Sequence, residues 1–350
     1  MRSIELAGIE ALRLKRDPSQ VTPSMFFDGV NQIRSLFAKL IHGKADRVCM
    51  IPSTSYGIAT IAQNLSLGSG DNIILIEGQF PSNVYAWRRL SKKTGATIHT
   101  VTGDSTTWTQ KVLETINYRT AVVAMETVHW ANGYSFDLLE ISQRARTVGA
   151  QLILDGTQSI GALPFDVQKI KPDALICAGY KWLFGPYGTA IMHVGERFID
   201  GIPLEESWVA RDGSENFGNL VNYTDQYRSG AVRFDRGQAN VFSHSAMLIE
   251  SLKQLLDWQP QRIQSYCSEL IQDFLPAIQS NGYKVSESNL SHIFAIGLPE
   301  HINLYHLNDE LMRQKISVSV RGNAIRISPN VYNNSANINA LQDVLLSVVK

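Results

Sequence analysis

An acid, an amide and a lysine stand at the ends of two apolar runs in the middle of the chain. Asp155 and Gln158 come just after the apolar residues 152–154, and Lys181 ends the next apolar run. A lysine can form a Schiff base with an aldehyde, and a carboxylate can hold a pyridine ring protonated so that the ring accepts electrons. Since pyridoxal phosphate carries both groups, these residues indicate an enzyme that uses this cofactor, with Lys181 and Asp155 as catalytic residues.

Each of these residues also has a purely structural alternative. Asp155 could cap a following helix, and Gln158, which would otherwise bond the phenolic oxygen of the cofactor, could be polar surface. Lys181 could extend past Trp182 into solvent. Residues 174–180 are too apolar to precede a solvated lysine, however, and desolvation lowers the pKa of an amine, as Schiff-base lysines require. The surroundings of Lys181 therefore favour catalysis.

Short apolar, β-branched runs that alternate with helical patterns predict the scaffold that positions these residues. Several runs are apolar throughout, which is typical of strands covered on both faces, so we expect an α/β fold with a mainly parallel seven-stranded sheet. Such folds bind ligands at the carboxyl ends of their strands, where Asp155 and Gln158 fall. The predicted strands are residues 47–51, 73–76, 97–101, 121–125, 151–154, 174–177 and 189–193.

The pattern changes after about residue 238. A helical stretch over residues 240–258 is interrupted at Gln259-Pro260, and a second runs over residues 262–279. Two strands, a helix, two strands and a terminal helix then predict a small α+β domain. The predicted division is residues 16–258 for a large cofactor-binding domain and 259–350 for the small C-terminal domain, with residues 1–15 packed against the latter.

Composition excludes several classes of partner. The 32 Lys and Arg residues balance the 32 Asp and Glu residues, which gives no case for nucleic acid. No apolar run has the length of a membrane span, and the charged start Met1-Arg-Ser-Ile-Glu-Leu is unlike a signal peptide. The three cysteines are far apart and odd in number, as in a reducing compartment, and no metal-binding motif is present. We expect a cytoplasmic protein that binds neither membranes nor metals.

Three motifs together resemble the class V aminotransferase family of fold-type I pyridoxal phosphate enzymes. They are Glu126-Thr-Val-His-Trp130-Ala-Asn-Gly133, Asp155-Gly-Thr-Gln158 and Tyr180-Lys181-Trp182-Leu-Phe-Gly185-Pro186, and the similarity extends over nearly the whole chain. The family includes cysteine desulfurases, kynureninases and isopenicillin N epimerase-like proteins. The resemblance implies the fold-type I architecture, a homodimer, a small-molecule amino acid substrate, and the roles of ring partner, phenolic-oxygen partner and Schiff-base lysine for Asp155, Gln158 and Lys181.

The phosphate of the cofactor is expected at Ser53-Thr54-Ser55. A strand ends here in small hydroxyl residues and a helix begins, so backbone N–H groups and the helix dipole could receive an anion. An ordinary helix N-cap explains the same residues equally well. The resemblance places the phosphate loop at this position. It also implies that Tyr180, where many relatives have histidine, reaches the phosphate, although its ring could simply pack beside Trp182.

The resemblance assigns three further side chains. Phe80, where desulfurases have histidine and kynureninases a similar Phe-Pro segment, would stack on the cofactor ring, or could be a core residue before a turn. Trp130 stands where relatives often have asparagine, and would line the pocket or only pack. Arg326 matches the arginine that binds the substrate α-carboxylate, although a surface ion pair is the alternative. Arg321 is expected to serve the structure.

One departure from the desulfurases narrows the expected chemistry. Those enzymes present a nucleophilic cysteine shortly before the equivalent of Arg326. Residues 286–325 of this chain contain no cysteine. Cys177 and Cys267 lie elsewhere and are expected to be packing residues. We therefore expect an enzyme that acts on an amino acid through a Lys181 Schiff base and a Cα carbanion, by transamination, epimerisation or side-chain lyase chemistry, and not a cysteine-dependent desulfurase. A catalytically weak, cofactor-binding scaffold or regulatory protein is the alternative.

Overall fold

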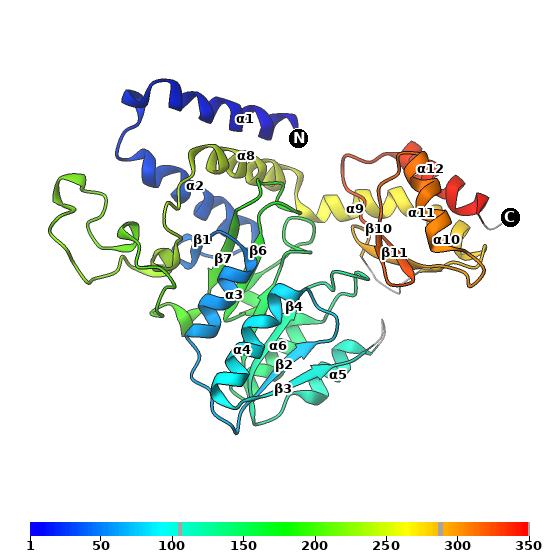
Figure 1. Cartoon of the computed structure of the whole chain (residues 1–350), viewed down its shortest axis with the longest axis horizontal. Coiled ribbons are helices and arrows are strands. Elements are labelled where there is room, and N and C mark those ends of the chain that lie inside the picture. The colour runs from blue at the N-terminus through cyan, green and yellow to red at the C-terminus, as the bar shows by residue number, and fades with distance from the viewer. Residues whose placement is uncertain (104–106, 286–289, 349–350) are drawn as a thin grey trace.

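A seven-stranded sheet forms the centre of the computed structural model, which describes residues 1–103, 107–285 and 290–348 (Figure 1). The strand order is β1-β7-β6-β5-β4-β2-β3. β7 runs antiparallel to both of its neighbours, and the remaining pairs are parallel. The predicted mainly parallel sheet of seven strands is thus confirmed. Its strands are β1 (Val48–Ile51), β2 (Asn72–Ile76), β3 (Thr97–Val101), β4 (Thr120–Glu126), β5 (Gln151–Asp155), β6 (Ala174–Ala178) and β7 (Ala190–Val194).

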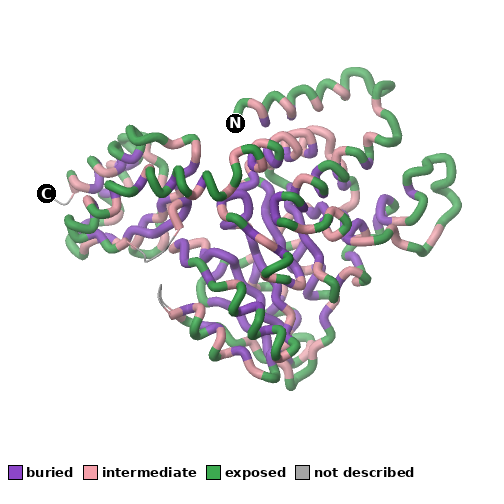
Figure 2. The backbone as a smooth tube through the Cα atoms, turned by 180° about the vertical axis from the view of Figure 1, so that it is seen from behind, coloured by how far each residue is buried: buried purple, intermediate pink, exposed green. Residues whose placement is uncertain are grey.

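Both faces of this sheet are covered, as continuous apolar strands require. Every residue of β1, β2, β6 and β7 is buried, and Figure 2 shows the buried centre of the molecule. Alternate residues of β6 enter different cores: Leu175 and Cys177 pack on one face, Ala174 and Ile176 on the other. The covering helices are α2 (Met25–Leu40), α3 (Thr54–Gln63), α4 (Tyr85–Thr94), α5 (Trp108–Thr115), α6 (Leu138–Thr147), α7 (Val167–Ile170) and α8 (Phe242–Trp258).

The N-terminal helix α1 (Arg2–Arg13) lies along α8, as Figure 1 shows. Its buried residues Ile4 and Gly8 face that helix, and the Gly8 backbone approaches the side chain of Met247. Residues 1–15 were expected beside the small C-terminal domain, and their position differs from that expectation. The reason is that an apolar helix stripe calls for a partner without specifying which one.

A second sheet with its own apolar core follows the large one in the chain. It is antiparallel, in the order β10-β11-β9-β8, and its core is separate from those of the large sheet. α8 ends where Gln259 takes a left-handed φ of 64°, and Pro260 begins the next helix. The predicted domain limits remain a prediction, although this break lies at residue 259. The elements are α9 (Pro260–Ile271), α10 (Phe274–Gln279), β8 (Lys284–Val285), β9 (Phe294–Gly297), α11 (Leu304–Arg313), β10 (Ser319–Arg321), β11 (Ala324–Ile327) and α12 (Ser335–Ser347).

Two kinds of feature are absent from the described residues. None of the helices in residues 1–103, 107–285 and 290–348 is long and apolar enough to cross a membrane. Within the same ranges, no three His, Cys, Asp or Glu side chains lie close enough together to hold a metal ion.

Candidate active site

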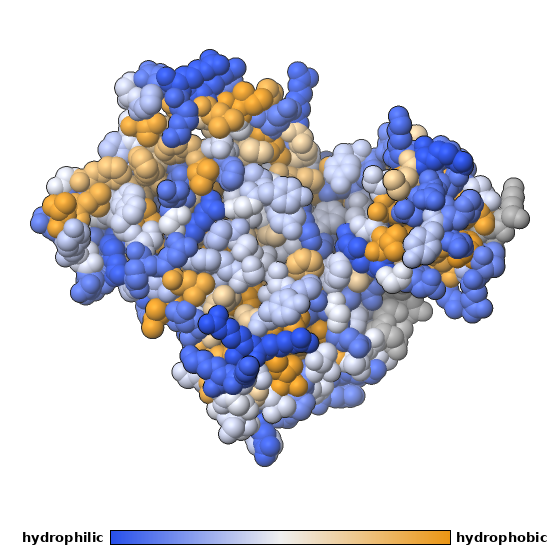
Figure 3. All heavy atoms as spheres, viewed as in Figure 1, coloured by the Kyte–Doolittle hydropathy of each residue, from blue (hydrophilic) through white to orange (hydrophobic). Residues whose placement is uncertain are grey.

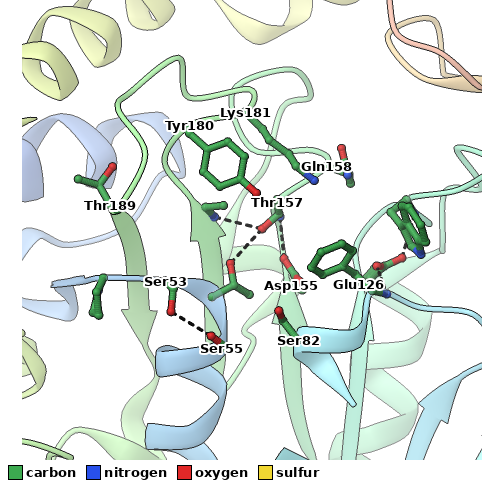
Figure 4. A pocket seen from close by; sticks show the side chains of 16 residues that line it. Ser53, Ser55, Ser82, Glu126, Asp155, Thr157, Gln158, Tyr180, Lys181 and Thr189 are labelled. Carbon is green, nitrogen blue, oxygen red and sulfur yellow. Dashed lines mark hydrogen bonds between the residues drawn. The ribbon is translucent and has the colours of Figure 1, made fainter. Parts of the chain in front are cut away.

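A pocket opens at the carboxyl ends of β1, β4, β5 and β6, where α/β folds bind their ligands (Figure 4). All nine side chains predicted to contact the cofactor line it, whereas Arg326 does not. The structure therefore brings together residues that are widely separated in the chain. The lining residues are Pro52, Ser53, Thr54, Ser55, Phe80, Ser82, Glu126, Trp130, Asp155, Thr157, Gln158, Ala178, Tyr180, Lys181, Gly188 and Thr189.

Asp155 is the last residue of β5 and is almost fully buried. Its Oδ1 accepts a hydrogen bond of 3.0 Å from the backbone N–H of Thr157. Burial raises the pKa of Asp155, while the bonds from Thr157 and the charge of Lys181 oppose that rise. The next helix, α7, begins only after Asp166, which caps it. Asp155 is thus no helix cap but a carboxyl group directed into a pocket.

Lys181 follows β6 in a tight turn and points into the pocket, as Figure 4 shows. Its Nζ lies 5.4 Å from the centre of the Phe80 ring. Burial lowers the pKa of Lys181, and the nearby Asp155 carboxylate partly restores it. A lysine with a lowered pKa is a better nucleophile near neutral pH because more of it carries a free electron pair.

Gln158 is buried behind Lys181. Its Oε1 accepts a 3.1 Å hydrogen bond from the indole N–H of Trp182, so the NH₂ end of the amide is the end available to donate. The backbone oxygen of Gln158 also lies 2.8 Å from Nε2 of His292. Gln158 is therefore a fixed donor in the wall of the pocket and not polar surface.

The predicted phosphate loop is both a helix cap and part of the pocket wall. Ser53 caps α3 by accepting a 3.2 Å bond from the N–H of Tyr56, and its hydroxyl lies 3.0 Å from that of Ser55. The Thr54 hydroxyl lies 3.4 Å from that of Thr157. A capped helix end with three hydroxyl groups is suited to an anion, so the two explanations left open by the sequence are compatible.

Phe80 and Trp130 form an aromatic corner of the pocket. Their rings meet edge to face, with centres 5.5 Å apart. Phe80 is 36% exposed and is therefore not a core residue, and the indole N–H of Trp130 donates a 2.7 Å bond to the oxygen of Gly78. An exposed ring face beside Lys181 is suited to stacking on a planar cofactor.

The ring of Tyr180 stacks on that of Tyr187, with centres 4.3 Å apart and planes inclined by 20°. The expected alternative was packing beside Trp182, but the Tyr180 ring is also part of the pocket wall. In Figure 4 its hydroxyl points toward Thr157.

Arg326 in β11 lies next to the pocket, behind Trp130. Its Nη1 donates a 2.7 Å bond to the backbone oxygen of Trp130, and its Nη2 lies 3.4 Å from the Ser319 hydroxyl. Among the described residues Arg326 has no acidic partner, so the surface ion pair considered as an alternative is not found there.

The sequence did not single out Glu126, the last residue of β4. It is buried, and its two oxygens accept bonds of 2.7 Å from the N–H of Phe80 and 2.9 Å from that of Trp130. Burial and the adjacent Asp155, its partner in the sheet register, raise the pKa of Glu126 to about 8. The sequence does contain a signal for Glu126: it is a single acid directly after the apolar run 121–125, as Asp155 is after the run 151–154.

Thr157 was also missed as a site residue. Its hydroxyl accepts a 3.0 Å bond from the N–H of Ala178 and so joins the turn after β5 to the end of β6. It stands inside the motif Asp155-Gly-Thr-Gln158, but a threonine in a turn carries no sign of such a role.

All three cysteines of the chain are buried. Burial raises the pKa of Cys49, Cys177 and Cys267, which disfavours the thiolate form. None of the three lines the pocket, so Cys177 and Cys267 are packing residues, as expected, and so is Cys49.

Comparison with known proteins supports the same interpretation. The family profile of Aminotransferase class-V matches residues 19–341. The uncharacterized aminotransferase YcbU of Bacillus subtilis (strain 168) is 23% identical over 309 residues, which are 86% of this chain and 78% of that protein. A cysteine desulfurase of Enterobacter sp. (strain 638) is 25% identical over 219 residues, 60% of this chain and 52% of the relative.

A solved structure extends the likeness to the fold. The cystine C–S lyase C-DES, in complex with its product cysteine persulfide, aligns with a TM-score of 0.88 at 15% identity and covers 99% of this chain and 94% of that one. At this level of identity the likeness concerns the fold, and it confirms the predicted fold class.

Proposed function

Because this chain belongs to the class V aminotransferase family of pyridoxal phosphate enzymes, we propose that it activates an amino acid at Cα, with Lys181 and Asp155 as its catalytic residues. The observation that carries the proposal is the convergence of a half-buried lysine, a buried carboxyl group and a hydroxyl-rich helix end in one pocket. The family match supports an enzyme and not the scaffold or regulatory protein that was the alternative.

The residues present fit pyridoxal phosphate. The buried Asp155 suits a protonated ring nitrogen, the NH₂ of Gln158 suits a phenolic oxygen, and the capped end of α3 suits a phosphate. Phe80 offers a ring face to a planar cofactor, and Trp130 and Tyr180 close the sides. When bound, the cofactor supplies an aldehyde for an amine and a ring that withdraws electrons from the attached carbon.

The chain itself then has three tasks. Lys181 would hold the cofactor through its amine, and the same amine would serve as the base for the proton at Cα. Asp155 keeps the ring nitrogen protonated. Arg326, whose guanidinium is held by Trp130 and Ser319, orients the substrate through its α-carboxylate.

The later fate of the substrate is transamination, epimerisation or side-chain cleavage that does not use a cysteine nucleophile. A desulfurase occurs among the relatives, but each cysteine here is buried and has a raised pKa, whereas a nucleophilic cysteine needs access and thiolate character. These properties support the exclusion of cysteine-dependent desulfuration for this chain.

Exchange of the Cα hydrogen tests the proposal without knowledge of the final product. The holoenzyme is incubated in D₂O with each common amino acid, and loss of the Cα–H signal is followed by proton NMR. We expect exchange with at least one amino acid, and a decrease on the order of 100-fold or more in Lys181→Ala. Lys169→Ala, which changes an exposed lysine, should exchange like the wild type. Exchange that persists in Lys181→Ala, or that occurs with no amino acid, would contradict the proposal.

We also propose that the protein is a cytoplasmic homodimer. The homodimer is supported by an irregular segment that exposes apolar side chains. Figure 3 shows part of this segment at the left of the molecule. Light scattering of the purified protein checks it, and the mass of a single 39.0 kDa chain at all concentrations would contradict it. The exposed side chains are Ile202, Leu204, Trp208, Phe217, Leu220, Val221 and Tyr223.

A further inference from the structure

Two arginines share one face of the hairpin formed by β10 and β11. Ser319 pairs with Arg326, and Arg321 pairs with Ala324. Side chains two residues apart in a strand point to the same side, so Arg321, Ser319 and Arg326 lie on one face, and the contact between Arg326 and Ser319 agrees with this arrangement. Arg321 and Arg326 are thus diagonal neighbours, for which a spacing of about 7–8 Å is usual.

Both guanidinium groups contact Trp130, at its two ends. The guanidinium carbon of Arg321 lies 4.6 Å from the centre of the indole ring, and Nη1 of Arg326 donates to the backbone oxygen. Trp130 in turn lines the pocket next to Phe80 and Lys181. Both positive groups are therefore held against a residue of the pocket wall, although neither arginine lines the pocket itself.

Neither guanidinium is neutralised by a carboxylate in the part of the chain that the structure describes. Among the described residues, Arg321 and Arg326 make no ion pair with a carboxylate. The Nε–H groups of both are buried without an acceptor there. Burial lowers the pKa of Arg326 and that of Lys181; Arg321 lowers both further, and Arg326 also lowers that of Lys181, because like charges repel.

The two acidic groups of the pocket, Glu126 and Asp155, do not remove this excess of positive charge. Glu126 is engaged by the N–H groups of Phe80 and Trp130, and burial holds its pKa near 8, so it is mostly uncharged at neutral pH. Asp155 accepts a bond from the N–H of Thr157. Buried donors without acceptors are costly, and two guanidinium groups without a carboxylate partner favour the binding of an anion.

We propose that Arg321 and Arg326 form two separate anion subsites, and that the substrate is an amino acid whose side chain carries a second acid group. This inference rests on the proposed function, in which Arg326 binds the α-carboxylate. One bidentate guanidinium already satisfies both oxygens of a carboxylate, and the spacing of the pair suits two acid groups on a short carbon chain. The cofactor phosphate does not compete for Arg321, because its expected place is the end of α3.

Affinity for matched acid and amide pairs tests this inference. The holoenzyme is titrated with glutamate and glutamine, and with aspartate and asparagine, and binding is read from the change in the absorption spectrum of the cofactor. We expect at least one acid to bind on the order of 10-fold more tightly than its amide, the difference expected for a charge-assisted hydrogen bond.

Variants of Arg321 assign the preference to that residue. Arg321→Gln should bind acid and amide equally, with the amide affinity of the wild type, whereas Arg321→Lys should keep part of the preference. Arg313→Gln, a change of an exposed arginine in the same part of the chain, should retain the full preference. If Arg321→Gln binds no amino acid at all, the acid preference is measured in Arg321→Lys instead. An Arg321→Lys variant that binds amino acids without preferring the acid overturns the inference.

The possible failures are distinguishable. Equal binding of acid and amide by the wild type overturns this inference and leaves the proposed function intact, and so does an acid preference that survives in Arg321→Gln. A wild-type cofactor spectrum that responds to no amino acid refutes the proposed function, and this inference with it.

Discussion

At the scale of single residues, two carboxyl groups occupy adjacent register positions at the ends of β4 and β5, and the protein uses them differently. Asp155 has one N–H donor in its turn and faces the pocket. Glu126 accepts two backbone N–H groups and has no cationic side chain bonded to it in the described part of the chain. Two carboxylates this close do not both ionise readily, and burial together with the adjacent Asp155 raises the pKa of Glu126 to about 8.

The protonation of Glu126 leads to a prediction about stability. Its pKa is raised from the usual 4.5 to about 8 in the fold, so between these pH values the folded protein holds a proton that the unfolded chain has lost. The free energy of unfolding should therefore fall as pH rises from 4.5 to 8, by at most about 1.4 kcal/mol per pH unit. Urea unfolding of the cofactor-free protein at several pH values measures this slope. Glu126→Gln should lack the contribution of Glu126 to the slope.

Glu126→Gln should also be less stable than the wild type at low pH. A glutamine offers one acceptor to the two N–H groups of Phe80 and Trp130, and a buried N–H without an acceptor costs about 1–3 kcal/mol. Equal pH slopes for wild type and variant would contradict the assigned protonation.

The individual site residues differ in how visible they are in the sequence. Lys181 and Asp155 could be predicted because each is a charge directly after an apolar run. Glu126 also directly follows an apolar run, but it is not one of the expected cofactor contacts. Its hydrogen bonds come from backbone N–H groups, whose positions a sequence does not give. Thr157 acts through a hydrogen bond to Ala178 across two strands, which only the sheet register reveals.

At the scale of elements, the position of α3 decides how its N-terminus meets a ligand. Gly57 in its first turns lies against the sheet, where an added Cβ would come within 2.6 Å of Cδ1 of Ile51 and 3.0 Å of Cγ2 of Ile176. The absence of a side chain at Gly57 therefore lets the helix sit directly on β1 and β6, with Ser53 and Thr54 at the edge of the pocket.

Gly57→Ala should displace this helix end. Alanine favours a helix interior by about 1 kcal/mol, but overpacking of a core costs about 1–3 kcal/mol. We expect a net loss of up to about 2 kcal/mol in the free energy of unfolding and weaker binding of pyridoxal phosphate, measured by urea unfolding and by fluorescence titration. Gly70→Ala is the matched control, because nothing lies within 4 Å of its added Cβ. Unchanged cofactor affinity in Gly57→Ala would show that the position of α3 does not matter for binding.

The elements themselves were largely predictable. Each of the seven strands was expected to within a residue or so at its ends, because strands covered on both faces are continuously apolar. The contact of α1 with α8 was not, since Ile4 and Gly8 define an apolar face without defining its partner. The β10–β11 hairpin is short, and its register, which sets the spacing of Arg321 and Arg326, follows from pairing that the sequence does not specify.

At the scale of the whole molecule, a buried histidine connects the segment before β9 to the active site. His292 contacts Gln264 of α9 through Nδ1 and the backbone oxygen of Gln158 through Nε2, both at 2.8 Å, and its ring meets Trp182 edge to face. A neutral imidazole that accepts at Nδ1 and donates at Nε2 satisfies both bonds. Burial lowers the pKa of His292 to about 4 and keeps the ring neutral.

This connection should make the protein sensitive to acid. Between pH 6.5 and pH 4 the unfolded chain protonates His292 while the folded protein does not, so stability should be lost as pH falls through this range, by at most about 1.4 kcal/mol per pH unit. His292→Gln should reduce that loss in urea unfolding, and it should weaken cofactor binding because it disturbs Gln158.

His193 provides the matched control. It is also buried with a pKa near 4, but it lies in β7 and does not line the pocket. His193→Gln should reduce the acid sensitivity to a similar extent and leave cofactor affinity unchanged. A cofactor affinity that falls equally in both variants would show that His292 has no special connection to the site.

The covalent attachment of pyridoxal phosphate is the most direct measure of the central claim. The holoenzyme is reduced with borohydride, digested, and its peptides are mapped by mass spectrometry. We expect the cofactor to be recovered only on the peptide that contains Lys181, and Lys181→Ala to carry none. Recovery of the cofactor on any other lysine would contradict this expectation.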